Sequence, residues 1–138
     1  MKNIYIASDH AGYDLKQNLL KEFPNTFLNL GTDSEKSVDY PDFAHILTNK
    51  VKSSPNNLGI LICGSGVGMS IAANRDSSIR AGLVYNAEIA KLIRQHNDAN
   101  VLVLPGRFID VQEAIKCVEN FLNTEFESGR HKKRIDKI

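Results

Sequence analysis

One segment sets the architecture of the chain: Leu58-Gly59-Ile60-Leu61-Ile62-Cys63, followed at once by Gly64-Ser65-Gly66-Val67-Gly68. The first six residues are almost entirely apolar, which is typical of a strand covered by helices on both faces. The alternating glycines predict a tight loop, and a helix through residues 72–74 is expected after it. A buried strand, a loop and a helix form the repeating unit of a parallel α/β sheet.

The same alternation extends in both directions from this segment. The other predicted strands are residues 3–8, 26–30, 80–84 and 101–104, with helices between them. One of these helices is expected to be capped by Asp42, another to begin at Asn86, and a third, amphipathic helix to be capped by Asp110. We therefore expect a single α/β domain over residues 1–138. Its predicted form is a Rossmann-like three-layer α/β/α sandwich with a five-stranded parallel sheet and a C-terminal basic helix.

Composition narrows the classes of protein. Of 138 residues, 42% are hydrophobic and 24% charged, with a net charge of +1, so nothing global directs the chain to nucleic acid or a membrane. Neither Cys63 nor Cys117 belongs to a C-x-x-C pair, which favours a reducing compartment. The sequence shows neither a signal-peptide pattern nor an apolar stretch long enough to span a bilayer. We expect a cytoplasmic protein, and no ligand spacing typical of a metal site is present.

In such sheets the ligand binds beyond the carboxyl ends of the strands. Those ends collect four segments: Ser8-Asp9-His10, Cys63 to Gly68, Tyr85-Asn86 and Pro105-Gly106-Arg107. The three loop glycines allow several backbone N–H groups to turn towards one point, beside a helix start that favours negative charge. This predicts an anion hole with a thiol at its edge, in surroundings that stabilise a thiolate.

Nucleotide-binding interpretations of the glycines fail in detail. A P-loop would end in Gly-Lys-Ser/Thr, whereas Gly68 is followed by Met69-Ser70, and Met69 also occupies the last Gly/Ala position of the dinucleotide fingerprint. Taken alone, the loop remains equally compatible with a tight turn beside a buried core cysteine.

The remaining titratable residues allow two interpretations each. His10 suits either a ligand contact or a helix cap, and His96 is more often solvated than catalytic when taken singly. His45 and His131 are expected to be structural or solvated, and Cys117 to fill the core.

The basic tail is usually a solvated chain end. However, Arg130 and Arg134 are spaced i, i+4, so a helix there would place both guanidinium groups on one face, where they could clamp a phosphate.

Taken together, the motifs resemble the B type of ribose-5-phosphate isomerase, in the family that also includes galactose-6-phosphate isomerase subunits. The motifs that carry this resemblance are Ser8-Asp9-His10-Ala11-Gly12, Asp39-Tyr40-Pro41, Ile62 to Gly68, Ser70-Ile71-Ala72-Ala73-Asn74, Arg94 to Val101 and Gly129-Arg130-His131. They extend over nearly the whole chain, and they are specific as a set. Two departures from the family pattern are Ser65, where many relatives have threonine, and Pro105 before Arg107.

The resemblance implies an aldose–ketose isomerase that interconverts D-ribose 5-phosphate and D-ribulose 5-phosphate through a cis-enediolate, in the non-oxidative pentose phosphate pathway. It assigns Cys63 as the base and His96 as the proton donor for ring opening. The supporting residues that it implies are Asp9, Ser65 and Tyr40 near the reacting groups, Gly64, Ser65, Gly66, Val67 and Gly68 as the anion hole, Asn97 on a sugar hydroxyl, and His10, Arg107, Arg130 and Arg134 on the phosphate. No metal or cofactor is implied.

The resemblance further implies a homodimer or tetramer in which two subunits complete each site. Two alternatives remain at this point. The first is an isomerase of a hexose 6-phosphate such as galactose or allose 6-phosphate, against which His96 argues. The second is a non-catalytic domain that binds a phosphate or a nucleotide at the same strand ends.

Overall fold

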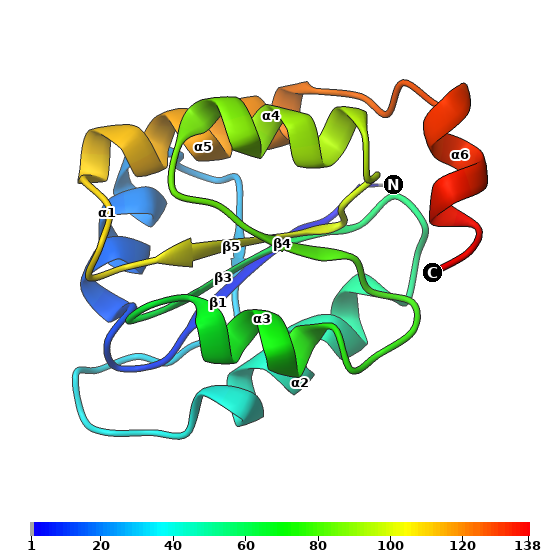
Figure 1. Cartoon of the computed structure of the whole chain (residues 1–138). Helices are drawn as coiled ribbons and strands as arrows, with labels where there is room; N and C mark the ends of the chain where they lie inside the picture. Colours follow the sequence, from blue (N-terminus) through cyan, green and yellow to red (C-terminus); the bar gives the residue numbers. More distant parts are fainter. Residues whose placement is uncertain (1) are drawn as a thin grey trace.

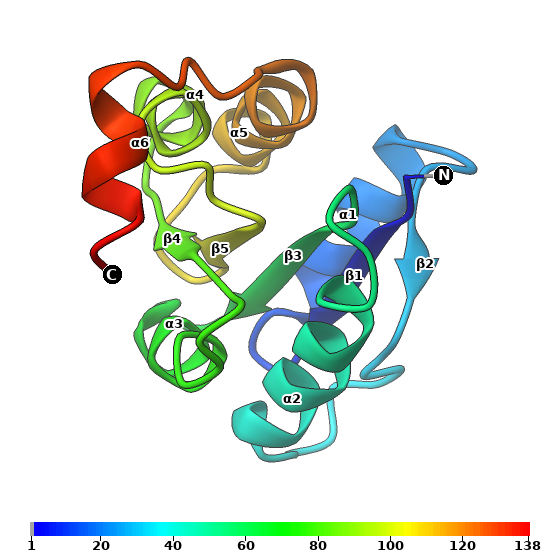
Figure 2. The same cartoon turned by 90° about the vertical axis from the view of Figure 1, so that its right-hand side faces the viewer.

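The computed structural model describes residues 2–138, which form a five-stranded parallel sheet with strand order β2-β1-β3-β5-β4. The strands are β1 (Ile4–Ser8), β2 (Leu28–Asn29), β3 (Leu58–Cys63), β4 (Ala81–Leu83) and β5 (Val101–Pro105). The helices are α1 (Tyr13–Glu22), α2 (Tyr40–Val51), α3 (Val67–Ala73), α4 (Ala87–Gln95), α5 (Val111–Asn123) and α6 (Arg130–Ile135). Helices α1, α4 and α5 cover one face of the sheet, and α2 and α3 cover the other (Figures 1 and 2). The predicted three-layer fold is confirmed.

Each face of the sheet has its own apolar core. Alternate residues of β3, such as Ile60 and Ile62, pack under α1, α4 and α5, whereas Leu61 and Cys63 point towards α2 and α3. Cys117 of α5 is fully buried, and burial raises its pKa to about 12. The prediction that Cys117 fills the core is therefore confirmed. Within residues 2–138, no helix is long and apolar enough to cross a membrane.

Two elements depart most from the sequence-based expectation, by more than a single residue at one end. Helix α2 begins at Tyr40 with Asp39 as its N-cap, so the predicted cap at Asp42 is wrong. Pro41 explains the difference, because proline fits the first turn of a helix, where its missing N–H costs nothing. The second strand shrinks to Leu28 and Asn29 at the outer edge of the sheet, although Leu30, Gly31 and Thr32 continue the backbone hydrogen bonds to β1.

Candidate active site

The carboxyl ends of three adjacent strands bring the first group of candidate residues together. Strand β3 lies between β1 and β5, where Ser8 is paired with Ile62 and Cys63 with Pro105. The segments that follow β1, β3 and β5, which contain Asp9, the glycine loop and Arg107, therefore leave the same edge of the sheet side by side. The linking contacts are short: the Asp9 amide donates to the Ile62 carbonyl at 3.2 Å, and the Gly106 amide donates to the Cys63 carbonyl at 2.8 Å.

The loop after β3 requires glycine at specific positions. Gly66 has φ +77°, in the left-handed region that favours glycine, and it caps α3. A Cβ atom on Gly68 would lie 2.5 Å from Cζ of Tyr40, so the absence of a side chain there allows the Tyr40 ring to lie against the loop. The Val67 amide donates to Ser65 Oγ at 3.3 Å, which holds the turn between them. These contacts place Tyr40 and Ser65 at the same loop.

The thiol of Cys63 lies at the border between core and loop. Only 5% of the residue is exposed, and it belongs to the apolar cluster under α2 and α3. The next two residues, Gly64 and Ser65, are half-buried. Cys63 is therefore the last core residue of β3 and at the same time the first residue at the edge where the loop begins.

The side chains of Asp9 and His10 both accept hydrogen bonds from backbone amides. Asp9 is buried, and its Oδ1 accepts a hydrogen bond from the Gly12 amide at 3.0 Å, which ties the carboxylate to the start of α1. His10 Nδ1 accepts from the Val38 amide at 3.2 Å. A neutral imidazole that accepts at Nδ1 carries its proton at Nε2, which leaves a donor free for a ligand. The alternative that the His10 side chain caps the next helix is wrong.

Arg107 extends the carboxyl edge with positive charge. Its amide donates to the Gly64 carbonyl at 3.0 Å, and its side chain lies over Gly64, where a Cβ atom would be 3.5 Å from Cδ of Arg107. Arg107 also borders a hollow of about 370 Å³ together with Tyr85 and Phe108. Both aromatic residues are at least half exposed, so this part of the edge presents apolar surface beside a guanidinium group.

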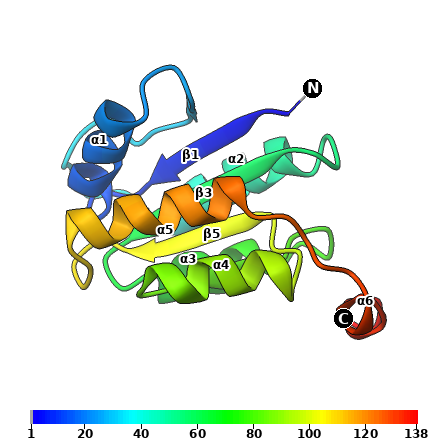
Figure 3. The ribbon, with the colours of Figure 1, turned by 90° about the horizontal axis from the view of Figure 1, so that it is seen from above.

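The second group of candidate residues lies at the opposite edge of the sheet. His96 follows α4 as its C-cap, Asn97 leads towards the start of β5, and Arg130 and Arg134 lie exposed on α6. Figures 1 and 3 show α6 beyond the end of the sheet at which the strands begin. The helix predicted for the basic tail is thus confirmed, with Arg130 and Arg134 one turn apart.

The strand ladder gives the separation of the two groups. Cys63 is level with Pro105, the last residue of β5, whereas His96 precedes Val101, the first. Four residue steps of about 3.3 Å put at least about 13 Å of strand between the two levels. Within one chain, the structure therefore brings Asp9, His10, Tyr40, Cys63 and Arg107 together but keeps them apart from His96, Asn97, Arg130 and Arg134.

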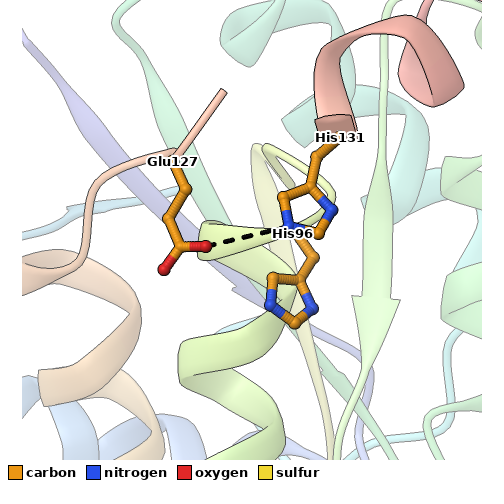
Figure 4. Close-up of side chains that lie close together, drawn as sticks. All are labelled: His96, Glu127 and His131. Atoms are coloured by element: carbon orange, nitrogen blue, oxygen red, sulfur yellow. Dashed lines mark ion pairs between the residues drawn. The ribbon is translucent and has the colours of Figure 1, made fainter. Parts of the chain in front are cut away.

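At the amino-terminal edge, His96 belongs to a cluster that the sequence analysis missed. Its ring stacks on the ring of His131, and Glu127 lies beside both (Figure 4). His131 is 8% exposed, so the expectation of a solvated side chain in the tail is wrong, whereas a structural role is compatible with its burial. Nothing in the polar tail marked this residue as buried, because the ring on which it stacks, that of His96, comes from a distant part of the chain. His45, by contrast, is exposed on α2.

The structure is that of a doubly wound α/β protein. A thiol, a glycine loop and basic side chains lie at the edges of its sheet as candidate functional groups. The profile of the family described as Ribose/Galactose Isomerase matches residues 4–138, and the chain belongs to this family. It is 49% identical over 139 residues to a probable ribose-5-phosphate isomerase B of Mycoplasma pneumoniae, covering 98% of this chain and 91% of that protein. It is 39% identical to ribose-5-phosphate isomerase B of Escherichia coli, covering 100% and 95% respectively.

Solved structures agree with the sequence matches. Ribose 5-phosphate isomerase B of Thermotoga maritima superposes with a TM-score of 0.93 at 48% identity, covering 99% of this chain and 95% of that one. The Mycoplasma genitalium enzyme with bound ribulose-5-phosphate superposes with a TM-score of 0.92, also at 48% identity, with 99% and 93% covered.

Proposed function

We propose that the protein is an aldose–ketose isomerase that interconverts D-ribose 5-phosphate and D-ribulose 5-phosphate. The observation that carries this proposal is the match over nearly the full length to a structure that holds ribulose-5-phosphate, at 48% identity. A phosphorylated pentose also suits the chain chemically, because the Cys63 thiol directly precedes the glycine loop and the Arg107 side chain lies over Gly64.

Proton transfer is assigned to Cys63. As the thiolate, it removes the proton from C2 of the open-chain aldose, and the electron pair moves to form a cis-enediolate. The resulting thiol then protonates C1 while the hydroxyl proton on O2 passes to O1, which gives the ketose, so no redox partner is needed. Backbone amides of Gly64 to Gly68 would stabilise the negative oxygen of the intermediate, and each well-aimed donor of this kind lowers the barrier by about 3–4 kcal/mol.

A complete site needs a second copy of the chain. His96, Asn97, Arg130 and Arg134 lie on the opposite edge from Cys63, so they can serve a neighbouring subunit but not their own. Exposed apolar side chains surround the carboxyl edge, as expected of a surface covered in an assembly. They are Tyr40, Val67, Ile71, Tyr85, Ile89, Phe108 and Val111. We propose a homodimer as the minimal unit, and a tetramer would repeat the same contact.

In the shared site, each subunit has a separate task. One subunit supplies Cys63, the glycine loop, Asp9, Ser65 and Tyr40. The partner's copy of His96 donates a proton to the ring oxygen, which opens the cyclic sugar, and the partner's copy of Asn97 holds a hydroxyl group. The phosphate would be bound between His10 and Arg107 of one subunit and the arginines of the other, where charge-assisted hydrogen bonds are strong.

The test separates the two proton-transfer steps. Exchange of deuterium from D2O into C1 of ribulose 5-phosphate reports enediolate formation by itself. This ketose cannot form a five-membered ring, so its exchange needs no ring opening. Cys63→Ala should lower both exchange and isomerisation by at least about a hundredfold, as expected when a general base is removed. His96→Gln should slow isomerisation of ribose 5-phosphate while exchange persists.

The same assays distinguish the alternatives. Preferred turnover of galactose or allose 6-phosphate would identify a hexose phosphate isomerase. Absence of turnover with all three sugar phosphates, together with tight phosphate binding, would identify a binding domain. Near-normal turnover of Cys63→Ala would refute the assignment of the base. A location in the cytoplasm remains a prediction from the sequence.

A further inference from the structure

The cluster at the amino-terminal edge contains two stacked imidazoles. The ring centroids of His96 and His131 are 4.3 Å apart, and the ring planes differ by 17°. Glu127 Oε1 lies 3.7 Å from Nε2 of His131 (Figure 4). His96 ends α4, His131 lies on α6, and Glu127 comes from the segment between α5 and α6. The end of α4 and the C-terminal stretch of the chain therefore meet at the proposed proton donor.

Hydrogen bonds fix these pieces to one another. The Glu127 amide donates to the carbonyl of Gln95, the residue before His96, at 3.1 Å. Arg94 donates through Nε to the Thr124 carbonyl at 3.2 Å and through Nη1 to the Ala99 carbonyl at 2.6 Å. The segment before α6 is thus tied to the end of α4 at Arg94 and Gln95, the two residues that precede His96. This gives His131 a fixed position from which to act on His96.

A metal ion explains the cluster less well. The candidate ligand atoms of His96, Glu127 and His131 all lie within 4.8 Å of one another. However, a ligating imidazole directs its nitrogen lone pair within the ring plane, and two nearly parallel planes cannot direct both lone pairs at one ion. The positive charges of Arg130 and Arg134 also act on His131 and would repel a cation.

The charges around His131 favour its neutral form. Burial lowers the pKa of His131, and the nearby charges of His96, Arg130 and Arg134 lower it further, while Glu127 opposes them. At neutral pH, a neutral His131 ring can therefore lie against His96 without competing for its proton. Stacking against a neutral, buried ring restricts rotation of the His96 side chain.

We propose that His131 is a positioning residue for His96, holding its imidazole by stacking in the orientation needed to donate a proton to the sugar ring of the neighbouring subunit. This inference rests on the proposed role of His96 in ring opening. His131 itself touches no reacting atom in this scheme, so its contribution should depend on the shape of the ring rather than on its nitrogen atoms.

Two substitutions separate shape from chemistry. His131→Ala removes the stack and should lower kcat for ribose 5-phosphate by about tenfold to a hundredfold, as misplaced catalytic groups do, with KM changed much less. His131→Phe keeps a flat ring and should restore most of the lost turnover. Lys132→Ala is the matched control, because Lys132 is exposed on the same helix and pairs with Asp136 at 2.6 Å. Its turnover should equal that of the unaltered protein.

Nuclear magnetic resonance of the full-length protein gives a readout independent of activity. The ring protons of His96 should be shielded by the stacked ring, should lose this shift in His131→Ala and should keep it in His131→Phe. Deuterium exchange into ribulose 5-phosphate should be unchanged in both variants, because enediolate formation does not need ring opening.

Each other outcome has a definite meaning. Equal loss of turnover in the Ala and Phe variants would overturn the positioning role and point to a chemical role for the imidazole nitrogens. A raised KM with unchanged kcat would overturn it in favour of a substrate contact. Normal turnover of His131→Ala together with impaired His96→Gln would refute this inference alone. Normal turnover of His96→Gln would instead refute the role of His96 in the proposed function.

Discussion

Mixing two inactive variants should restore activity if each site is built from two chains. We consider Cys63→Ala in one chain and His96→Gln in the other. The two positions lie on opposite edges of the sheet, at least about 13 Å apart along the strands, so one chain cannot bring them together. In a mixed dimer, one site then combines both altered residues, whereas the other combines an intact Cys63 with an intact His96.

The size of the rescue follows from symmetry. Random pairing of equal amounts makes about half of the dimers mixed, and each mixed dimer of this symmetric type has one intact site out of two. The mixture should therefore recover about one quarter of the activity of the unaltered protein, against about one hundredth or less for Cys63→Ala alone. If both residues served the same chain, no combination of the two variants would restore an intact site.

The assay requires chains that have exchanged partners. The variants are co-expressed with different affinity tags, mixed assemblies are isolated on both tags in turn, and the conversion of ribose 5-phosphate is followed. These isolated mixed dimers should reach about one half of the activity of the unaltered protein, because each has one intact site out of two. A chain that carries both substitutions, paired with an unsubstituted chain, is the control for assembly. Activity of the mixed assemblies no greater than the average of the two variants would refute the shared site.

Four further outcomes are expected. Arg134→Ala should raise KM for ribose 5-phosphate by about tenfold with little change in kcat, because a phosphate contact stabilises ground and transition states alike; an unchanged KM would remove Arg134 from the site. Gly68→Ala should lower turnover by about tenfold, because the new Cβ atom would lie 2.5 Å from the Tyr40 ring. Turnover measured after exhaustive chelation should be unchanged, and loss restored by one metal ion would contradict the mechanism. Urea unfolding should show stability falling as pH drops below about 6.5, because His131 has a lowered pKa in the folded state and takes up its proton more readily when unfolded; His131→Phe should reduce that dependence.

Local sequence patterns were sufficient for the sheet and for its carboxyl edge. The apolar run before Cys63 and the loop glycines identify a buried strand and a tight turn, and parallel topology then places Asp9 and Arg107 beside them. The start of α2 was misplaced because capping preferences compete within a few residues, and Pro41 shifts the balance there. The shift of the cap from Asp42 to Asp39 arises from local energies that are nearly equal.

The division of the candidate residues between the two edges of the sheet can also be predicted from the sequence, through the order of helices and strands. His96 follows a helix and precedes a strand, and in a parallel sheet such a residue lies at the edge where the strands begin. The burial of His131 has no comparable signal. It depends on Arg94 and Glu127 fixing the segment before α6, and these contacts join residues about thirty positions apart.

The short helix α6 connects the two roles proposed for the amino-terminal edge, which are phosphate binding and proton donation. Six residues are too few for a helix to be stable in water by itself, so its order must come from contacts with the rest of the chain. His131 supplies such a contact by packing on His96, while Arg130 and Arg134 remain exposed on the same helix. The proposed phosphate clamp and the proposed proton donor are thereby held at a fixed distance from each other. A neighbouring subunit would receive both as one rigid unit, so phosphate binding would also align the sugar ring with His96.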